Sequence, residues 1–170
     1  MTSFSTRLAI AAAAALCSFS AAAQSPVQVI AQQPPGSGSD AMTRIWAECV
    51  ARQTGQPMVV VNKPGANGTI GAALVAKAEP DGHTLLLSSV GAITIIPHVR
   101  DVGYDPLNGL IPVTQAVRLS LMWLARTGLE AKTMADLIKL DKAGIKLSAG
   151  TSGNGSPNHI AIEQFNLMAG

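Results

Sequence analysis

The organisation of this chain is set by residues 27–50, which read VQVIAQQPPGSGSDAMTRIWAECV. Residues 27–31 form a short apolar run, and the apolar residues of 42–50 recur at helical spacing, so the stretch predicts a strand, a turn and a helix. Within the turn, Gly36 and Gly38 leave room for close approach to the backbone, and Ser37 and Ser39 add hydroxyl groups. The N–H groups of a helix's first turn lack intrahelical partners and carry partial positive charge. The stretch therefore predicts an anion-binding site.

Two more loops have the same Gly-rich and polar character. Residues 62–68 (NKPGANG) precede a predicted helix, and residues 150–156 (GTSGNGS) precede a second one that begins at Pro157 with Ser156 as its N-cap. In an open parallel sheet, loops that follow strands and precede helices lie at the carboxyl ends of the strands, where ligands bind. One such loop is explained equally well as a tight turn, but three favour contact with a ligand.

The alternation of elements predicts an α/β fold with a parallel sheet and right-handed crossovers. The first half of the chain is expected to hold a strand at 27–31, a helix that ends at Gly55, a strand at 58–61 covered on both faces, a helix at 69–78 and a strand at 84–88. Residues 90–110 are irregular and indicate a crossing between domains. The second half is expected to hold strands at 111–117, 121–125 and 145–149 and a helix at 133–143, which starts with a Thr133 and Asp136 capping box.

The N-terminus has the pattern of a secretory signal peptide over residues 1–23, with cleavage after Ala23. Arg7 supplies the positive charge, and residues 8–19 are rich in Ala and Leu but too short for a confident membrane span. After cleavage only Cys49 remains, so no intramolecular disulfide is expected. Because Cys49 falls on the apolar face of the first helix, we expect it to be a buried structural thiol.

Charge and residue spacing argue against several functions. The chain has 12 Lys and Arg against 10 Asp and Glu, with no basic cluster, so we expect no nucleic-acid or anionic-membrane partner. His83, His98 and His159 lack metal-ligand spacing, and neither a metal nor another cofactor is expected. His159 follows the third loop by one helical turn, where it either orients that loop, contacts a ligand or plays a structural role.

An enzymatic alternative rests on Gly36-x-Gly38-x-x-Ala41, which matches a dinucleotide-binding fingerprint. The acidic residue required near the end of the second strand is replaced by Val61 and Asn62, and Asp40 would repel a pyrophosphate. Hydrolytic chemistry has no Gly-x-Ser-x-Gly elbow to support it. A nucleotide-dependent or hydrolytic α/β enzyme therefore remains the second hypothesis.

Five motifs in order carry a resemblance to a known family: residues 34–40 (PPGSGSD), 62–71 (NKPGANGTIG), 78–85 (AEPDGHTL), 104–106 (YDP) and 153–159 (GNGSPNH). Together they resemble the periplasmic substrate-binding receptors of tripartite tricarboxylate transporters, called Bug receptors. The resemblance implies a type II periplasmic binding protein fold, with parallel sheets and flanking helices, that closes on a small carboxylate without catalysis. It also implies a periplasmic location and membrane components of the transporter as partners. In the family's first loop, Ser37 stands where a second Gly is usual.

The resemblance implies domain boundaries and ligand contacts as well. Residues 24–108 correspond to the first part of ligand-binding domain 1, and residues 109–170 to part of domain 2. The implied ligand-binding residues are Gly36, Ser37, Ser39, Asp40, Asn67, Gly68, Ser88, Thr151, Gly155, Ser156 and His159.

Family members are roughly twice as long as this chain, so the fold is expected to be incomplete. We expect a truncated or partial receptor in which both sheets lack strands and helical cover. A polypeptide that ended at Gly170 is expected to be poorly soluble and to bind ligand weakly, because a cleft needs both of its walls.

Overall fold

The computed structural model describes residues 25–170, and the predicted signal peptide lies outside them. Strands β1 (Val27–Ala31), β2 (Met58–Asn62) and β3 (Thr84–Leu87) form a parallel sheet in the order β2-β1-β3. The central strand β1 is buried at four of its five residues, as its apolar sequence requires. The predicted α/β fold with a parallel sheet is confirmed.

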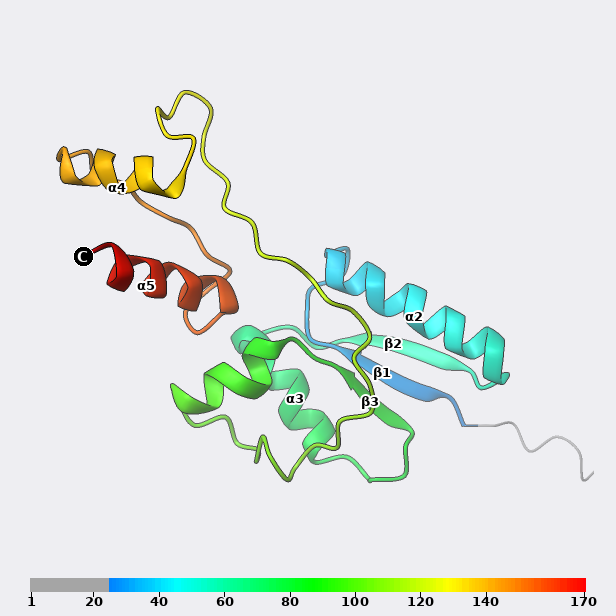
Figure 1. Cartoon of the computed structure of the whole chain (residues 1–170). Helices are drawn as coiled ribbons and strands as arrows, with labels where there is room; N and C mark the ends of the chain where they lie inside the picture. The colour runs from blue at the N-terminus through cyan, green and yellow to red at the C-terminus, as the bar shows by residue number, and fades with distance from the viewer. Residues whose placement is uncertain (1–24) are drawn as a thin grey trace, which may run out of the picture.

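Helices cover the two faces of this sheet (Figure 1). Helix α2 (Gly38–Thr54) packs on β1 and β2, while α3 (Thr69–Ala76) packs on the other side against β1 and β3. Two short turns, η2 (Gly91–Ile95) and η3 (Ile96–His98), occupy part of the stretch that was expected to be irregular. Helix α2 ends at Gly55 in a left-handed conformation, φ 72°, as predicted. We call this body, residues 25–104, the sheet lobe.

The face of α2 that meets the sheet differs from the predicted apolar face. Thr43 and Ala47 are buried, whereas Ile45 is 61% exposed and Cys49 is only half-buried, so the prediction of a buried thiol was wrong. Small side chains let the helix backbone approach the strands closely, and the Thr43 hydroxyl is satisfied by donating to the Ser39 carbonyl oxygen at 2.7 Å.

Strand β2 was expected to be covered on both faces, and this was also wrong. It lies at one edge of the described sheet, and its Val59 side chain is 47% exposed. The apolar run of β2 is therefore covered by α2 on one face only, and no helix of residues 25–170 covers its other face.

The second body, residues 121–170, is the helical lobe and contains α4 (Met134–Lys142) and α5 (Pro157–Ala169). The capping box of Thr133 and Asp136 is present as predicted. The strands expected at 111–117, 121–125 and 145–149 are not formed in this part of the chain. Strands exist only when their backbone groups are paired, and the described residues offer these segments no strand partner.

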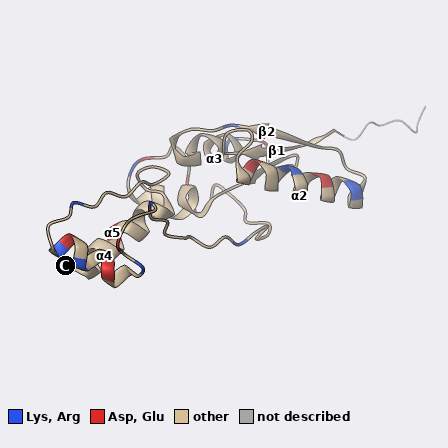
Figure 2. Ribbon diagram, turned by 90° about the horizontal axis from the view of Figure 1, so that it is seen from above, with Lys and Arg blue, Asp and Glu red and all other residues tan. Residues whose placement is uncertain are grey.

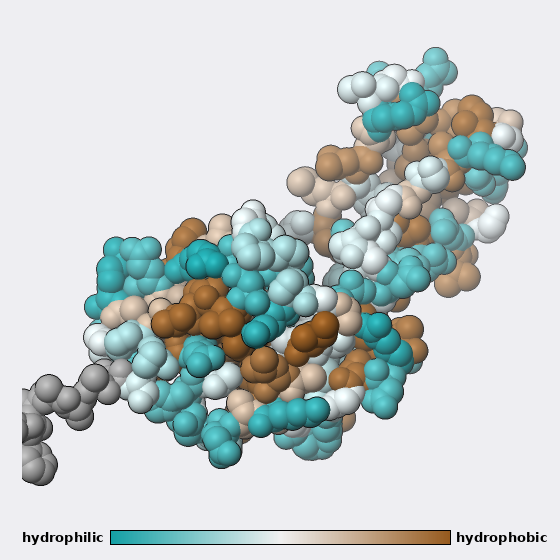
Figure 3. All heavy atoms as spheres, turned by 180° about the vertical axis from the view of Figure 1, so that it is seen from behind, coloured by the Kyte–Doolittle hydropathy of each residue, from teal (hydrophilic) through white to brown (hydrophobic). Residues whose placement is uncertain are grey.

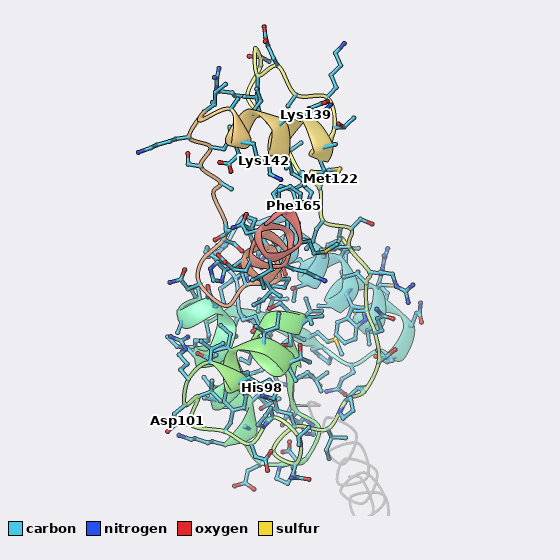
Figure 4. The ribbon with its side chains drawn as sticks, turned by 60° about the vertical axis from the view of Figure 1, so that its left-hand side comes forward. His98, Asp101, Met122, Lys139, Lys142 and Phe165 are labelled. Atoms are coloured by element: carbon cyan, nitrogen blue, oxygen red, sulfur yellow. The ribbon has the colours of Figure 1, made fainter. Side chains whose placement is uncertain are left out.

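The unpaired segments leave a large open trough in the helical lobe. Its volume is about 1220 Å³, and its lining mixes apolar side chains such as Phe165 of α5 and Met122 with charged ones such as Lys142 (Figure 4). The rings of Trp123 and Phe165 lie 5.5 Å apart, centroid to centroid, which is a typical aromatic contact.

The surface has mixed charge and scattered apolar patches. Figure 2 shows basic and acidic residues interspersed along α2 and near α4. Figure 3 shows two lobes joined by a narrow contact, with hydrophobic residues gathered on both. Within residues 25–170, no helix is long and apolar enough to cross a membrane.

Candidate functional site

A hollow of about 520 Å³ lies where the three predicted loops meet. Its walls come from residues 32–39, 64–68 and 152–158, with further contributions from Ser89, Gly91 and Leu119. Six of the predicted ligand-binding residues line it: Ser37, Ser39, Asn67, Gly68, Gly155 and Ser156.

Two helices begin at this hollow, and each is capped by a serine. The Ser37 hydroxyl accepts the backbone N–H of Asp40 at 3.1 Å at the start of α2. The Ser156 hydroxyl accepts the backbone N–H of His159 at 3.2 Å at the start of α5. Both hydroxyls keep their own hydrogen available for a ligand, and both helix termini add partial positive charge to the same space.

The second loop joins the sheet lobe to the third loop. The Asn67 side chain donates to the Asn154 carbonyl oxygen at 2.6 Å. To do so, Asn67 adopts a left-handed conformation, φ 56°, which costs less for Asn than for most residues. A Cβ on Gly153 would lie 2.9 Å from the Asn67 amide oxygen, so the two loops approach closely here.

Asp40 holds the first loop rather than lining the hollow. Its carboxylate accepts the Gly36 N–H at 2.9 Å and the Asn62 amide at 2.8 Å, and it forms an ion pair with Arg44 at 3.1 Å. Hydrogen bonds from Arg44, Asn62 and Gly36 lower the pKa of Asp40 to about 2, although burial opposes the shift. Because Asp40 engages Gly36, that N–H points toward the carboxylate, and the first loop is braced against β2.

The other three predicted residues also lie outside the lining. The Thr151 hydroxyl accepts the Gly153 N–H at 3.2 Å, and Nδ1 of His159 accepts the Gly155 N–H at 3.3 Å. His159 Nε2 lies 3.6 Å from a Glu163 carboxylate oxygen. Ser88 lies beside Gln32 with its hydroxyl 2.9 Å from the Gln32 amide. In this geometry Thr151 and His159 shape the third loop.

Several lining residues were missed by sequence reasoning. Gln32, Ser89 and Ser152 line the hollow, and Asn62 anchors the second loop through Asp40 and the Gln33 carbonyl oxygen. A polar residue directly after a buried apolar strand was the available signal for Gln32.

The lining has a defined chemical character. It contains no Asp, Glu, Lys, Arg or His among the described residues, and it consists of amides, hydroxyls, glycines, prolines and the apolar side chains of Ala66 and Leu119. Among residues 25–170, no group of three or more His, Cys, Asp or Glu side chains is placed to hold a metal ion. Such a site stabilises an anion by helix termini and hydrogen-bond donors.

Comparison with known proteins places the chain among receptors. The sequence profile of the tripartite tricarboxylate transporter family receptor matches residues 42–170. The chain belongs to this receptor family. Its relatives include the protein BugT of Bordetella pertussis, which is 34% identical over 151 residues. That match covers 85% of this chain and 45% of BugT, so the chain spans less than half of that relative's length.

Solved structures of the receptor class share the fold. MatC of Rhodopseudomonas palustris with bound malate superimposes with a TM-score of 0.71 at 26% identity, covering 85% of this chain and 50% of MatC. The R. palustris protein Rpa4515 with adipate gives a TM-score of 0.69 at 28% identity, over 85% of this chain and 49% of Rpa4515. The periplasmic binding protein fold is therefore shown for about half of the relatives' architecture, and this chain resembles periplasmic receptors.

Proposed function

We propose that this chain is part of an extracytoplasmic solute receptor that binds a small carboxylate for a tripartite tricarboxylate-type transporter, without catalysis. Residues 24–108 belong to one ligand-binding domain and residues 109–170 to a second. The hollow between their loops is the carboxylate site, and the transporter's membrane components are the partners that receive the ligand.

One observation carries the proposal. The serine-capped N-termini of α2 and α5 come from opposite lobes and border the same uncharged hollow. A carboxylate placed there gains charge-assisted hydrogen bonds from N–H and O–H donors and a favourable interaction with two helix dipoles. Because hydrogen-bond donors lie on both walls, a bound ligand would favour closure of the two lobes around it.

The relatives support this ligand class. MatC was solved with malate and Rpa4515 with adipate, and both are dicarboxylates. We therefore place malate and adipate first among candidate ligands, followed by tricarboxylates, aspartate and nicotinate-type acids.

The nucleotide alternative is weakened by the first loop. A pyrophosphate on the Gly36-x-Gly38-x-x-Ala41 turn would lie near the buried, ionised carboxylate of Asp40, which already accepts the Gly36 N–H. Because the Gly36 N–H is already bonded to Asp40, it is not available to a pyrophosphate, as it would be in a dinucleotide-binding fold.

Isothermal titration calorimetry with malate, adipate, citrate and aspartate tests the proposal directly. We expect the complete receptor of which this chain is part to bind at least one acid with a Kd in the micromolar range, which corresponds to about −8 kcal/mol, and a polypeptide ending at Gly170 to bind more weakly. The same acid at 100 times its Kd should stabilise the fold by about 2.7 kcal/mol in thermal unfolding.

The matched controls are the neutral diamide of the bound acid and the nucleotides NAD and ATP. The diamide should bind much more weakly, because it lacks the charge that the helix termini favour. Binding of NAD or ATP in place of every acid, or turnover of a nucleotide, would replace the receptor proposal by the enzymatic one.

A further inference from the structure

Gln32 is the most deeply placed polar group of the hollow. It follows β1 directly, is 3% exposed and lies on the floor between the second loop and the turn after β3. A long amide buried this deeply loses its water contacts, and that loss is recovered only through hydrogen bonds to the protein or a ligand.

The Gln32 amide joins two walls of the site. In the orientation that satisfies it, the amide nitrogen donates to the Gly68 carbonyl oxygen at 2.9 Å, and the amide oxygen accepts the Ser88 hydroxyl at 2.9 Å. The same oxygen also accepts the backbone N–H of Ser89. One side chain thus connects the loop before α3 to the turn after β3.

Gly68 is fitted around this amide. A Cβ at Gly68 would lie 2.7 Å from Cδ of Gln32, and the backbone of Gly68 is left-handed, φ +92°. Only glycine meets both conditions without displacing the amide.

One N–H of the Gln32 amide has no acceptor among these contacts. The oxygen accepts two bonds, which fills its lone pairs, whereas the nitrogen carries two hydrogens and has one acceptor among these contacts. Gln32 is itself part of the lining of the hollow. We propose that Gln32 is a specificity-determining residue that fixes the two walls and offers its remaining N–H to an oxygen of the bound carboxylate. This inference rests on the proposed function.

Two nearly isosteric variants separate these roles. Gln32→Glu keeps the acceptor oxygens for Ser88 and Ser89 but removes the donor and adds a negative charge at neutral pH. Gln32→Met removes both functions and adds no charge. Gln53 is exposed on α2, so Gln53→Glu and Gln53→Met serve as matched controls.

The experiment measures malate and adipate affinity by calorimetry and the exchange rate of the Ser89 amide hydrogen by NMR. We expect Gln32→Glu to keep Ser89 protected while its affinity for both acids falls more than tenfold. We expect Gln32→Met to lose Ser89 protection and to bind more weakly than wild type but more tightly than Gln32→Glu. The two Gln53 variants should match wild type.

If the wild type binds and both Gln32 variants bind with the same affinity as the wild type, the inference is overturned, while the proposed function stands. Equal loss of affinity in both variants would reduce Gln32 to a packing role and would also overturn it. If wild type bound no carboxylate, the proposed function and the donor role would fail together. In that case the Ser89 exchange rate alone would test whether Gln32 positions the turn after β3. An unchanged rate in Gln32→Met would overturn this positioning role as well.

Discussion

The side chain of Asn67 donates a hydrogen bond of 2.6 Å to the backbone carbonyl oxygen of Asn154, which lies 87 positions further along the chain. This bond joins the sheet lobe to the loop that precedes α5. Asn67 also lines the hollow that the two serine-capped helices border. The lobes are therefore connected through the candidate site itself.

Substitutions of Asn67 test this connection. Asn67→Gly removes the bond and tolerates φ 56°, whereas Asn67→Ala removes the bond and keeps a Cβ in the left-handed region without the polar side chain that lets Asn adopt it, which costs about 1–2 kcal/mol. We expect Asn67→Ala to unfold at a lower Tm than Asn67→Gly. Both should speed amide exchange in residues 150–156. Equal exchange in wild type and both variants would show that the bond does not hold the loop.

The capping serines allow structure and ligand binding to be separated. Ser37→Ala or Ser156→Ala should each cost about 1 kcal/mol of stability, whereas substitution by glycine should cost only a few tenths. Both kinds of variant lack the hydroxyl that faces the hollow. We expect Ser37→Gly to keep a near-wild-type Tm and to bind malate several-fold more weakly in calorimetry. Undiminished affinity in Ser37→Gly would exclude a donor role for this hydroxyl.

Asp40 predicts a defined dependence of stability on pH. Its folded-state pKa of about 2 lies below the ordinary value of 3.8, so its ionised form stabilises the fold above pH about 4. This contribution is lost as the pH falls from about 4 to 2. The Tm of Asp40→Asn should therefore lie below that of wild type at pH 6, and the difference should shrink toward zero near pH 2.

Glu48→Gln is the control for that series, because Glu48 is exposed on the same helix with Arg52 at 4.0 Å. Its Tm should follow wild type throughout. A Tm difference for Asp40→Asn that stayed constant from pH 6 to pH 2 would contradict the assigned role of the carboxylate.

Gly68 and Gln32 should be energetically coupled. Gly68→Ala forces a Cβ against the Gln32 amide and into a left-handed backbone, so it should destabilise the fold markedly. In Gln32→Ala the collision is absent, and Gly68→Ala should then cost less. A double-mutant cycle measured by urea unfolding should give a coupling energy of at least about 0.5 kcal/mol. Strict additivity would show that the two residues do not constrain each other.

Local patterns in the sequence predicted several elements of both lobes. The apolar run at 27–31, the end of α2 at Gly55 and the caps at Thr133 and Ser156 depend on neighbours within a few residues. Such features can be read from the chain directly. The strands expected at 111–117, 121–125 and 145–149 could not, because strand formation requires distant backbone partners, and none pairs with them within residues 25–170.

The sequence by itself determined the α/β alternation, the three polar loops and the receptor family, because each is encoded in local spacing and motif order. Only the tertiary structure decided which loop residues face a common hollow and which brace it. Asp40 turns to Gly36 in its own loop and to Asn62 at the end of β2, and His159 turns to Gly155 in its own loop. Gln32 enters the site because the parallel sheet places the end of β1 between the second loop and the turn after β3. That proximity exists only after the chain has folded.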